Sequence, residues 1–259
     1  MASAYKYLKV ENVAGLRKLI ISNLAKRNAL NICAYNELTD ALQMAAADDS
    51  VSIVALTGEG EYYSSGNDIS KFLTVMDPQN EIKEAYTALK SLIRGICCFP
   101  KLLICVVNGP CIGIAATTAV LCDIIYATEN AFFYTPFTKL GLCPEGCASY
   151  TFQRILGKSK ASEMLFLNHK LSAQEALQFN LISKIYNKSN LNTELWMPLI
   201  ESSKLPPDSL RVTKKLINAA DMKNFEDACD RELKELFIRF ESEEFMQAVM
   251  DFMSRKSKL

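Results

Sequence analysis

Histidine is nearly absent from the sequence, and this scarcity narrows the chemistry that the protein can perform. One histidine, His169, occurs among 259 residues. A metal site built from several histidines is therefore excluded, and a Ser-His-Asp or Cys-His mechanism would have a single candidate base. His169 stands between Asn168 and Lys170, a polar setting typical of a surface or helix-capping residue. We expect no metal site, and a carboxylate is the more natural general base.

A surplus of charge of one sign is also missing. The sequence has 29 Lys and Arg residues and 29 Asp and Glu residues, so its formal net charge is zero. A protein that binds nucleic acid or an anionic membrane through a general field carries an excess of positive charge. We therefore expect no nucleic-acid partner. Hydrophobic residues make up 49% of the chain, which excludes global disorder and, at this length, predicts one sizeable domain.

Short motifs for nucleotide, hydrolase and disulfide chemistry are missing as well. No GxxxxGK[ST] or GxSxG sequence occurs, and after Gly58-Glu59-Gly60 the third glycine of a dinucleotide fingerprint is replaced by Tyr63. The nine cysteines are irregularly spaced and form no CxxC pair. We interpret them as small buried apolar residues in a reducing compartment, because a disulfide framework would be expected to show a more regular pattern.

One long apolar stretch, residues 102–127, imitates a membrane span. Asn108-Gly109-Pro110 places a turn in its middle, and Asp123 places a charge near its end. The part before the turn is rich in β-branched residues, whereas the part after it carries small residues suited to a close-packed helix. The stretch therefore predicts a buried strand, a sharp turn and a buried helix, and we expect no membrane span.

The rest of the sequence alternates strands and helices. Apolar or alternating runs predict strands at 5–13, 16–23, 51–57, 102–107, 123–128 and 132–134, and helical periodicity predicts helices at 34–47, 81–98 and 112–121. Such alternation predicts an α/β fold with parallel strand pairing. From about residue 149 onward the sequence is typical of helices, and Leu205-Pro206-Pro207 marks a break before the last of them.

Three loops rich in glycine are candidates for a functional site. They are residues 64–68, 108–114 and 141–147, and nine of the ten glycines lie between Gly58 and Gly157. Glycine permits close approach of a ligand to the backbone. The first two loops join a buried strand to a predicted helix, where free backbone N–H groups can stabilise a developing negative oxygen.

The third loop contains a lone carboxylate, Glu145, among apolar neighbours such as Leu142 and Cys147. Apolar surroundings disfavour the charged form of a carboxylate, so its pKa rises and it becomes a stronger base. The alternative is an ordinary residue at the start of a helix, stabilised by the helix dipole. The local sequence leaves both interpretations open.

Four sequence blocks, in this order, resemble the crotonase (enoyl-CoA hydratase/isomerase) superfamily: Ser64-Ser65-Gly66-Asn67-Asp68-Ile69, Asn108-Gly109-Pro110-Cys111-Ile112-Gly113, Cys122-Asp123-Ile124-Ile125-Tyr126-Ala127 and Leu171-Ser172-Ala173-Gln174-Glu175-Ala176. The resemblance implies a spiral of β-β-α units in residues 1–200, with a CoA-thioester site, and a C-terminal helical trimerisation region in residues 201–259. It also implies a homotrimer or hexamer, an acyl-CoA thioester as substrate, and an oxyanion hole. Coenzyme A then belongs to the substrate, and no separate cofactor is expected.

The resemblance assigns candidate roles to individual residues. The two N–H donors of the oxyanion hole fall on Asn67 and Ile114. Substrate-binding positions fall on Lys26, Arg27, Leu30, Ser64, Ser65, Gly66, Asn67, Asp68, Gly113, Phe137, Phe252 and Arg255.

Variable positions of the superfamily favour isomerisation over hydration. The two glutamates with which hydratases activate water are replaced by Thr117 and Phe137. Glu145 instead matches the single base of the Δ3,Δ2-enoyl-CoA isomerases of the peroxisomal type. Our hypothesis is that Glu145 moves a proton from C2 to C4 of a 3-enoyl-CoA, giving the 2-trans product, in a pocket walled by Phe137 and Ile114. A dienoyl-CoA isomerase, another enolate-forming enzyme and a catalytically silent acyl-CoA binder stay open as alternatives.

The last three residues, Ser257-Lys258-Leu259, match a peroxisomal address that an import receptor reads. We therefore expect the peroxisomal matrix as the location and the import receptor as a partner. This agrees with a role in the β-oxidation of unsaturated fatty acids. The sequence leaves a mitochondrial pool open, although its start lacks the Arg-rich pattern of a transit peptide.

Overall fold

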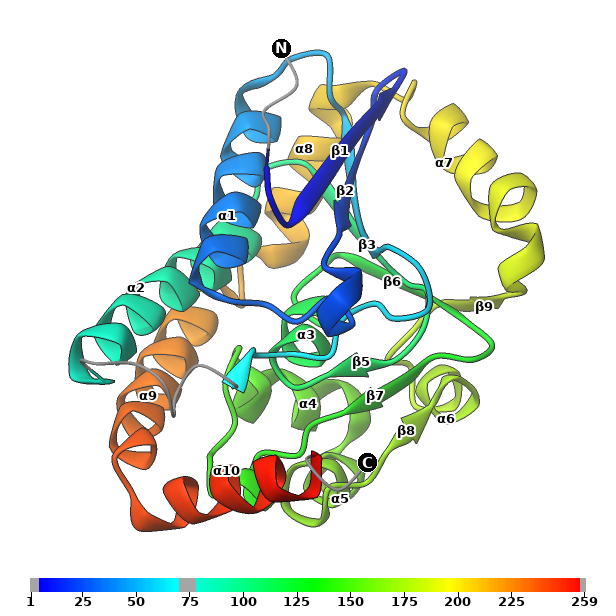
Figure 1. Ribbon diagram of the computed structural model, residues 1–259. Coiled ribbons are helices and arrows are strands. Elements are labelled where there is room, and N and C mark those ends of the chain that lie inside the picture. The colour runs from blue at the N-terminus through cyan, green and yellow to red at the C-terminus, as the bar shows by residue number, and fades with distance from the viewer. Residues whose placement is uncertain (1–4, 70–77, 257–259) are drawn as a thin grey trace.

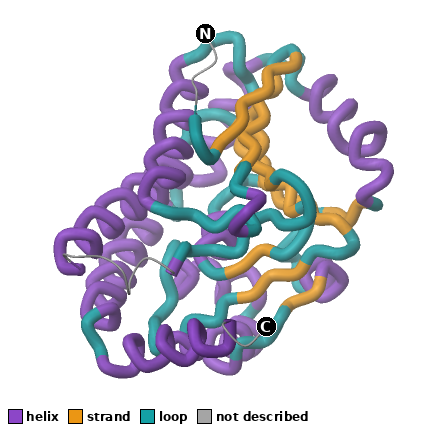
Figure 2. Tube along the Cα trace, in the orientation of Figure 1, coloured by secondary structure: helices purple, strands orange, loops and turns teal. Residues whose placement is uncertain are grey.

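A six-stranded sheet forms the centre of the protein in a computed structural model, which describes residues 5–69 and 78–256. Figure 2 shows the strands running through the middle of the molecule with helices on either side. The strand order is β1-β2-β3-β4-β6-β9. The bounds are β1 Leu8–Val13, β2 Leu16–Ile21, β3 Ile53–Gly58, β4 Leu102–Val107, β6 Ile124–Thr128 and β9 Lys184–Tyr186.

The pairing follows the expected α/β pattern. β1 and β2 form an antiparallel hairpin, and every later pair in this sheet is parallel. All six residues of β3 are buried, as are five of the six in β4. Continuous apolar strands of this kind are typical of parallel sheets that are covered on both faces. The α/β prediction is confirmed.

A second, three-stranded sheet has the order β5-β7-β8, with bounds Cys111–Ile112, Phe132–Tyr134 and Leu171–Ser172. Its strand β8, and β9 of the main sheet, lie in the region that the sequence predicts to be helical. That prediction is wrong at these two places because the strands are only two and three residues long and pair with distant segments. Ser172 also caps the following helix through a capping box with Glu175, so the local signal is helical.

The helices surround both sheets (Figure 1). Their bounds are α1 Ile32–Ala47, α2 Pro78–Cys97, α3 Ile114–Ala119, α4 Ala148–Leu156, α5 Lys158–Leu167, α6 Ala173–Gln178, α7 Met197–Ser202, α8 Pro207–Asn218, α9 Met222–Phe240 and α10 Glu243–Lys256. Helix α2 packs between α1 and α9. Residues near 40, 90 and 230 therefore lie side by side.

The apolar stretch at 102–127 folds as a strand, a turn and a helix, as its sequence predicts. It contains β4, β5, α3 and the first part of β6. Among the described residues, no helix combines the length and the apolar character that crossing a membrane requires.

The cysteine prediction is only partly correct. All nine cysteines are free thiols, and five of them are buried. Cys97 and Cys143 are half-buried, however, and Cys33 and Cys98 are exposed. Cys97 and Cys98 are neighbours at the end of α2, where adjacent side chains point in different directions and cannot both reach the core.

A buried lysine holds the C-terminal end of α1, the helix whose first residues lie at the candidate site described below. The side chain of Lys101, 2% exposed, donates to the carbonyl oxygens of Ala45 at 2.8 Å and Asp48 at 2.6 Å. Carbonyl groups in the last turn of a helix have no partner within the helix, and a cation there also matches the helix dipole. Lys101 therefore anchors α1 to the start of β4.

Candidate active site

The first glycine-rich loop is clamped between two other segments of the chain. On one side the N–H of Leu30 donates to the oxygen of Gly66, and the N–H of Asp68 donates to the oxygen of Leu30, both at 2.8 Å. On the other side the N–H of Ile112 donates to the oxygen of Ser64 at 3.0 Å. Backbone pairing thus brings together three predicted site segments that are about 40 residues apart in sequence.

Gly66 permits the closest approach within this arrangement. Its φ is +85°, and a Cβ atom built on it would lie 2.6 Å from the carbonyl oxygen of Ile112. No real Cβ tolerates that distance to backbone. The absence of a side chain at residue 66 is what allows the loop carrying Asn67 to lie against the loop carrying Gly113 and Ile114.

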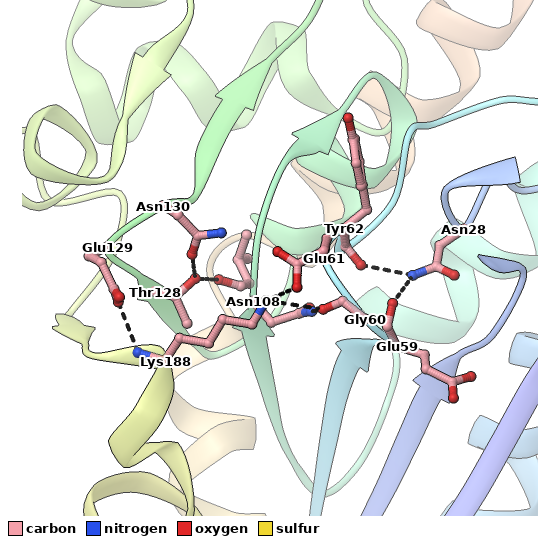
Figure 3. Close-up of polar contacts among 11 residues, drawn as sticks. Asn28, Glu59, Gly60, Glu61, Tyr62, Asn108, Thr128, Glu129, Asn130 and Lys188 are labelled. Atoms are coloured by element: carbon pink, nitrogen blue, oxygen red, sulfur yellow. Dashed lines mark hydrogen bonds and ion pairs between the residues drawn. The ribbon is translucent and has the colours of Figure 1, made fainter. Parts of the chain in front are cut away.

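Buried asparagines support these loops from behind (Figure 3). The Asn28 side chain donates to the carbonyl oxygens of Glu59 at 2.9 Å and Tyr62 at 2.8 Å. Asn108 donates to the oxygen of Gly60 at 3.1 Å. The segment that follows β3 is thereby fixed to the segments that follow β2 and β4, and this fixes the geometry of the loop at 64–68.

The backbone N–H groups of Asn67 and Ile114 are available for a ligand. Within the ranges 5–69 and 78–256, neither donates to a protein acceptor. Gly113 precedes Ile114 with φ +59°, so the chain turns sharply before α3 begins. The predicted use of these two groups as oxyanion donors is compatible with this geometry and stays a prediction.

Glu145 lies in the loop between the short 3₁₀ helix Thr138–Leu140 and α4. Its residue is only 3% exposed. One carboxylate oxygen, Oε1, accepts a hydrogen bond from Asn67 Nδ2 at 3.1 Å. The other, Oε2, is buried and has no hydrogen-bond partner in the described part of the chain. Oε2 is therefore the atom with free capacity to accept a proton.

Burial makes Glu145 a strong base. Its pKa is raised from 4.5 to about 8: loss of hydration is the largest cause, the nearby carboxylate of Glu232 adds to it, and the hydrogen bond from Asn67 acts in the opposite direction. A carboxylate kept in apolar surroundings near another carboxylate holds a proton at neutral pH more tightly than in water. This agrees with the interpretation of Glu145 as a general base.

The carboxylate that binds the free N–H groups at the start of α4 is Glu232, on α9, and not Glu145. It accepts hydrogen bonds from the N–H groups of Cys147 at 2.6 Å and Ser149 at 2.7 Å, at the beginning of α4. Because α9 also contributes to the cavity described next, Glu232 ties the loop of Glu145 to a wall of that cavity. The sequence does not reveal this, since Glu232 is one of many charged residues in an amphipathic helix.

A small cavity of about 60 Å³ adjoins Glu145. Helices α1, α2 and α9 contribute most of its lining, which is largely apolar: Leu30, Asn31, Ile32, Tyr35, Asn67, Asp68, Ile82, Ala85, Tyr86, Leu89, Glu145, Leu233, Leu236, Phe237 and Phe240. Such a lining excludes water from the reacting atoms of an acyl chain.

Phe137 and Ile114 do not belong to the lining of this cavity in the described part of the chain. Their place in the wall of an acyl pocket stays a prediction. Phe137 is buried elsewhere, and its carbonyl oxygen accepts from the N–H of Leu142 at 2.9 Å, which supports the loop leading to Glu145. The walls come instead from α2 and α9, helices that are distant from Glu145 in sequence.

Tyr35 is a site residue that the sequence analysis missed. It lies on the buried face of α1, lines the cavity, and donates its hydroxyl to Asn67 Oδ1. In the sequence it stands at a core position of an amphipathic helix beside Ala34 and Leu38, where an aromatic residue signals only packing.

Among the other predicted binding residues of the loops, Leu30, Asn67 and Asp68 line this cavity, whereas Lys26, Arg27, Ser64 and Ser65 do not belong to its lining in the described residues. Lys26 forms an ion pair with Asp68 at 2.6 Å, and Arg27 lies over the ring of Tyr62, 5.4 Å from its centroid. The hydroxyl groups of Ser64 and Ser65 donate to the carbonyl oxygens of Asn28 at 2.7 Å and Lys26 at 3.0 Å.

The remaining sequence predictions lie away from the site or beyond the described residues. His169 pairs with Glu175 at 3.0 Å and does not line the cavity. Phe252 and Arg255 belong to α10, but their side chains are outside the described residues, as is the whole of Ser257–Leu259. In the described ranges, no group of His, Cys, Asp and Glu residues is arranged to hold a metal ion.

The sequence profile of the enoyl-CoA hydratase/isomerase family matches residues 11–258. The chain belongs to that family. A human protein named enoyl-CoA delta isomerase 2 is 40% identical over 260 residues, which cover all of this chain and 66% of the human protein. This chain therefore spans slightly less than two thirds of that relative.

Two further relatives of this family member agree in sequence and in fold. A mouse protein named enoyl-CoA delta isomerase 3, peroxisomal, is 35% identical over 254 residues, which cover 98% of this chain and 80% of the mouse protein. The crystal structure of an enoyl-CoA hydratase/isomerase from Pseudoalteromonas atlantica T6c has a TM-score of 0.88 at 27% identity, covering 96% of this chain and 98% of that one. The crotonase-type fold expected from the sequence is confirmed.

At Thr117 and Phe137, the two positions that the resemblance matches to the hydratase glutamates, this member has no carboxylate. Thr117 is fully buried and donates its hydroxyl to the carbonyl oxygen of Ile114 at 3.1 Å. It packs so closely on Gly146 that a Cβ atom at residue 146 would lie 2.3 Å from the threonine oxygen. Thr117 and the backbone of Gly146 are therefore in close contact, on the residue that follows Glu145.

Proposed function

We propose that the protein is an enoyl-CoA isomerase that converts a 3-enoyl-CoA into the 2-trans-enoyl-CoA. The observation that carries this proposal is the buried Glu145, which presents one unpartnered carboxylate oxygen beside an apolar cavity. The names of the human and mouse relatives, both enoyl-CoA delta isomerases, support the same reaction. Family membership supports an acyl-CoA thioester as the substrate.

In the proposed mechanism Glu145 Oε2 removes a proton from C2 of the substrate. The electrons of the broken C–H bond form a C2–C1 double bond, and the thioester oxygen takes the negative charge of a dienolate. Glu145 then returns the proton to C4, the double bond moves to C2–C3, and the carboxylate is regenerated. A single base serves both carbons because C2 and C4 lie on one side of a bent allylic system.

The dienolate oxygen would be stabilised by the free backbone N–H groups of Asn67 and Ile114. Loss of one such donor typically costs about 3 kcal/mol of transition-state stabilisation. The apolar cavity and the absence of carboxylates at Thr117 and Phe137 disfavour the addition of water to the product. Isomerisation is therefore favoured over hydration.

A direct assay tests this function. The protein is given 3-hexenoyl-CoA, and the conjugated 2-enoyl product is followed by its ultraviolet absorbance. We expect steady product formation, and with 2-hexenoyl-CoA we expect little loss of absorbance, because hydration lacks its acid–base pair. No absorbance gain together with retained acyl-CoA binding would favour a silent binder. Turnover of a 3,5-dienoyl-CoA in place of 3-hexenoyl-CoA would favour a dienoyl-CoA isomerase.

We further propose that the protein acts in the peroxisome as a trimer or a pair of trimers. The name of the mouse relative supports the location, and the assembly is the one that the resemblance to the crotonase superfamily implies. Light scattering after gel filtration should give a mass of three or six chains of 28.9 kDa. Fluorescence microscopy of the tagged chain should show overlap with a peroxisomal marker that is lost when residues 257–259 are removed. A monomeric mass or diffuse fluorescence of the intact chain contradicts the respective proposal.

A further inference from the structure

We propose that the hydroxyl of Tyr35 is a positioning group for the base: it fixes which end of the Asn67 side-chain amide faces Glu145. In this role Tyr35 acts on the reaction through Asn67 and Glu145, without itself exchanging a proton with the substrate. The inference rests on the proposed function only where it is tested by turnover of 3-hexenoyl-CoA; the titration of Glu145 can be measured without a substrate.

The geometry links three side chains from three separate segments. Tyr35, 3% exposed, comes from α1 and donates its O–H to Asn67 Oδ1. Asn67, from the loop at 64–68, donates from Nδ2 to Glu145 Oε1 at 3.1 Å. The amide has its acceptor on one side and its donors on the other, so a donor bound to Oδ1 leaves Nδ2 to face Glu145.

The orientation of this amide affects the ionised base more than the protonated base. With Nδ2 toward Glu145, the amide stabilises the carboxylate through a charge-assisted hydrogen bond. In the opposite orientation Oδ1 would face Oε1, and two acceptors can share a hydrogen bond only if Glu145 is protonated. By donating to Oδ1, Tyr35 favours the orientation that suits the ionised base.

Tyr35 is well suited to remain a donor. Burial, together with the nearby Glu145, raises the pKa of its hydroxyl well above the ordinary value. The phenol therefore stays protonated over the whole pH range in which Glu145 titrates. A serine or a water molecule in its place would be free to rotate, whereas the tyrosine ring is held by the packing of α1.

The backbone places Tyr35 and Asn67 as one unit. Leu30 pairs with the backbone on both sides of Asn67, and Asn31 then caps α1 by accepting from the N–H of Ala34 at 2.9 Å. Tyr35 therefore lies only about one helical turn after Leu30, the residue that pairs with the backbone around Asn67. The segment from 30 to 35 sets both the backbone and the side-chain orientation of Asn67.

Other titratable groups near Glu145 would be unchanged by a substitution at Tyr35. Helix α9 contributes Glu232, the loop of Glu145 itself contributes Cys143, and the loop at 64–68 contributes Asp68, which is paired with Lys26. Tyr86 of α2 also lines the cavity, and the other lining residues of α2 are apolar. A change in the titration of Glu145 in a Tyr35 variant therefore reports on the Tyr35–Asn67 link.

The test is the Tyr35→Phe variant, which keeps the ring in the cavity and removes only the hydroxyl. Its matched control is Tyr150→Phe, since Tyr150 donates its hydroxyl to Asp221 on another surface of the protein. We expect the rising limb of the pH profile of kcat/KM for 3-hexenoyl-CoA to move about one unit toward higher pH in Tyr35→Phe, with about a tenfold loss at pH 7. The Tyr150→Phe profile should coincide with that of the unchanged protein.

Two further measurements separate this role from packing and from the proposed function. In an Asn67→Ala background, Tyr35→Phe should have no additional effect on the limb, because the amide that it orients is gone. Carbon-13 NMR titration of the Glu145 carboxyl, assigned with Glu145→Gln, should show the same upward shift without any substrate. An unmoved limb and an unmoved NMR titration in Tyr35→Phe, or an equal loss in the Asn67→Ala background, would overturn the inference. An NMR shift without turnover in the unchanged protein would contradict the proposed function and retain the role of Tyr35.

Discussion

Replacement of Glu145 by glutamine should lower kcat/KM for 3-hexenoyl-CoA by about 10³-fold or more. Glutamine has the size of glutamate and can still accept a hydrogen bond from Asn67 Nδ2, but it cannot take a proton from carbon. General base catalysis typically contributes about 10²–10⁴-fold, and in this site a single group serves both proton transfers. Steady-state kinetics with purified Glu145→Gln protein measures the loss.

The control for this experiment is Glu235→Gln, on the exposed side of α9 and outside the cavity lining. It removes the same charge one helical turn from Glu232 and should keep turnover unchanged. Calorimetric titration with a saturated acyl-CoA should give similar dissociation constants for both variants, because the CoA contacts are intact. Turnover of Glu145→Gln near that of the unchanged protein would remove Glu145 from the mechanism.

Stability and activity should respond to pH in opposite directions, and Glu145 should be the cause of both. Its pKa in the folded protein is about 8, against an ordinary value of 4.5. Between these values the folded state holds a proton that the unfolded chain has lost, so the free energy of unfolding falls as pH rises. Each unit of difference in pKa corresponds to about 1.4 kcal/mol, which amounts to several kcal/mol above pH 8.

Urea denaturation of the unchanged protein and of Glu145→Gln between pH 5 and pH 9 measures this effect. The free energies of unfolding of the two proteins should be similar near pH 5. Toward pH 9 that of the unchanged protein should fall, so that the glutamine variant becomes progressively more stable than the unchanged protein. Over the same interval kcat/KM of the unchanged protein should rise with pH, reach half of its plateau near pH 8 and level off above that, as the base becomes ionised. A stability difference that is constant with pH would contradict a raised pKa of Glu145.

The sequence predicts the parts of the site that are encoded locally. Glu145 is a candidate because its apolar neighbours stand beside it in the chain, although only the resemblance favours a base over a helix-start residue. The glycine-rich loops can be recognised because glycine marks close backbone approach. The α/β fold follows from alternating apolar runs such as Val51–Thr57 and Leu102–Val107. These signals need no knowledge of which distant segments meet.

Partners that arrive from distant segments could not be identified in this way. Leu233, Leu236 and Phe240 are recognisable as one face of a helix, but nothing in their spacing says that this face meets Glu145. Tyr35 and Glu232 have the same limitation, because each carries a polar group whose partner lies more than 30 residues away. Phe137 was placed in the wall because the resemblance matches it to a catalytic position, and it does not belong to the lining of this cavity in the described residues.

The cavity's dependence on α9 also has a consequence for synthesis of the protein. Its lining begins at Leu30 and ends at Phe240, so it spans nearly the whole chain. A growing chain already carries all three glycine-rich loops, including the candidate base, well before Leu233 to Phe240 have been made. Until then the apolar residues of α1 and α2 that face α9 are uncovered, and exposed apolar surface of this kind promotes aggregation. Docking of α9 therefore both completes the cavity and covers this apolar surface.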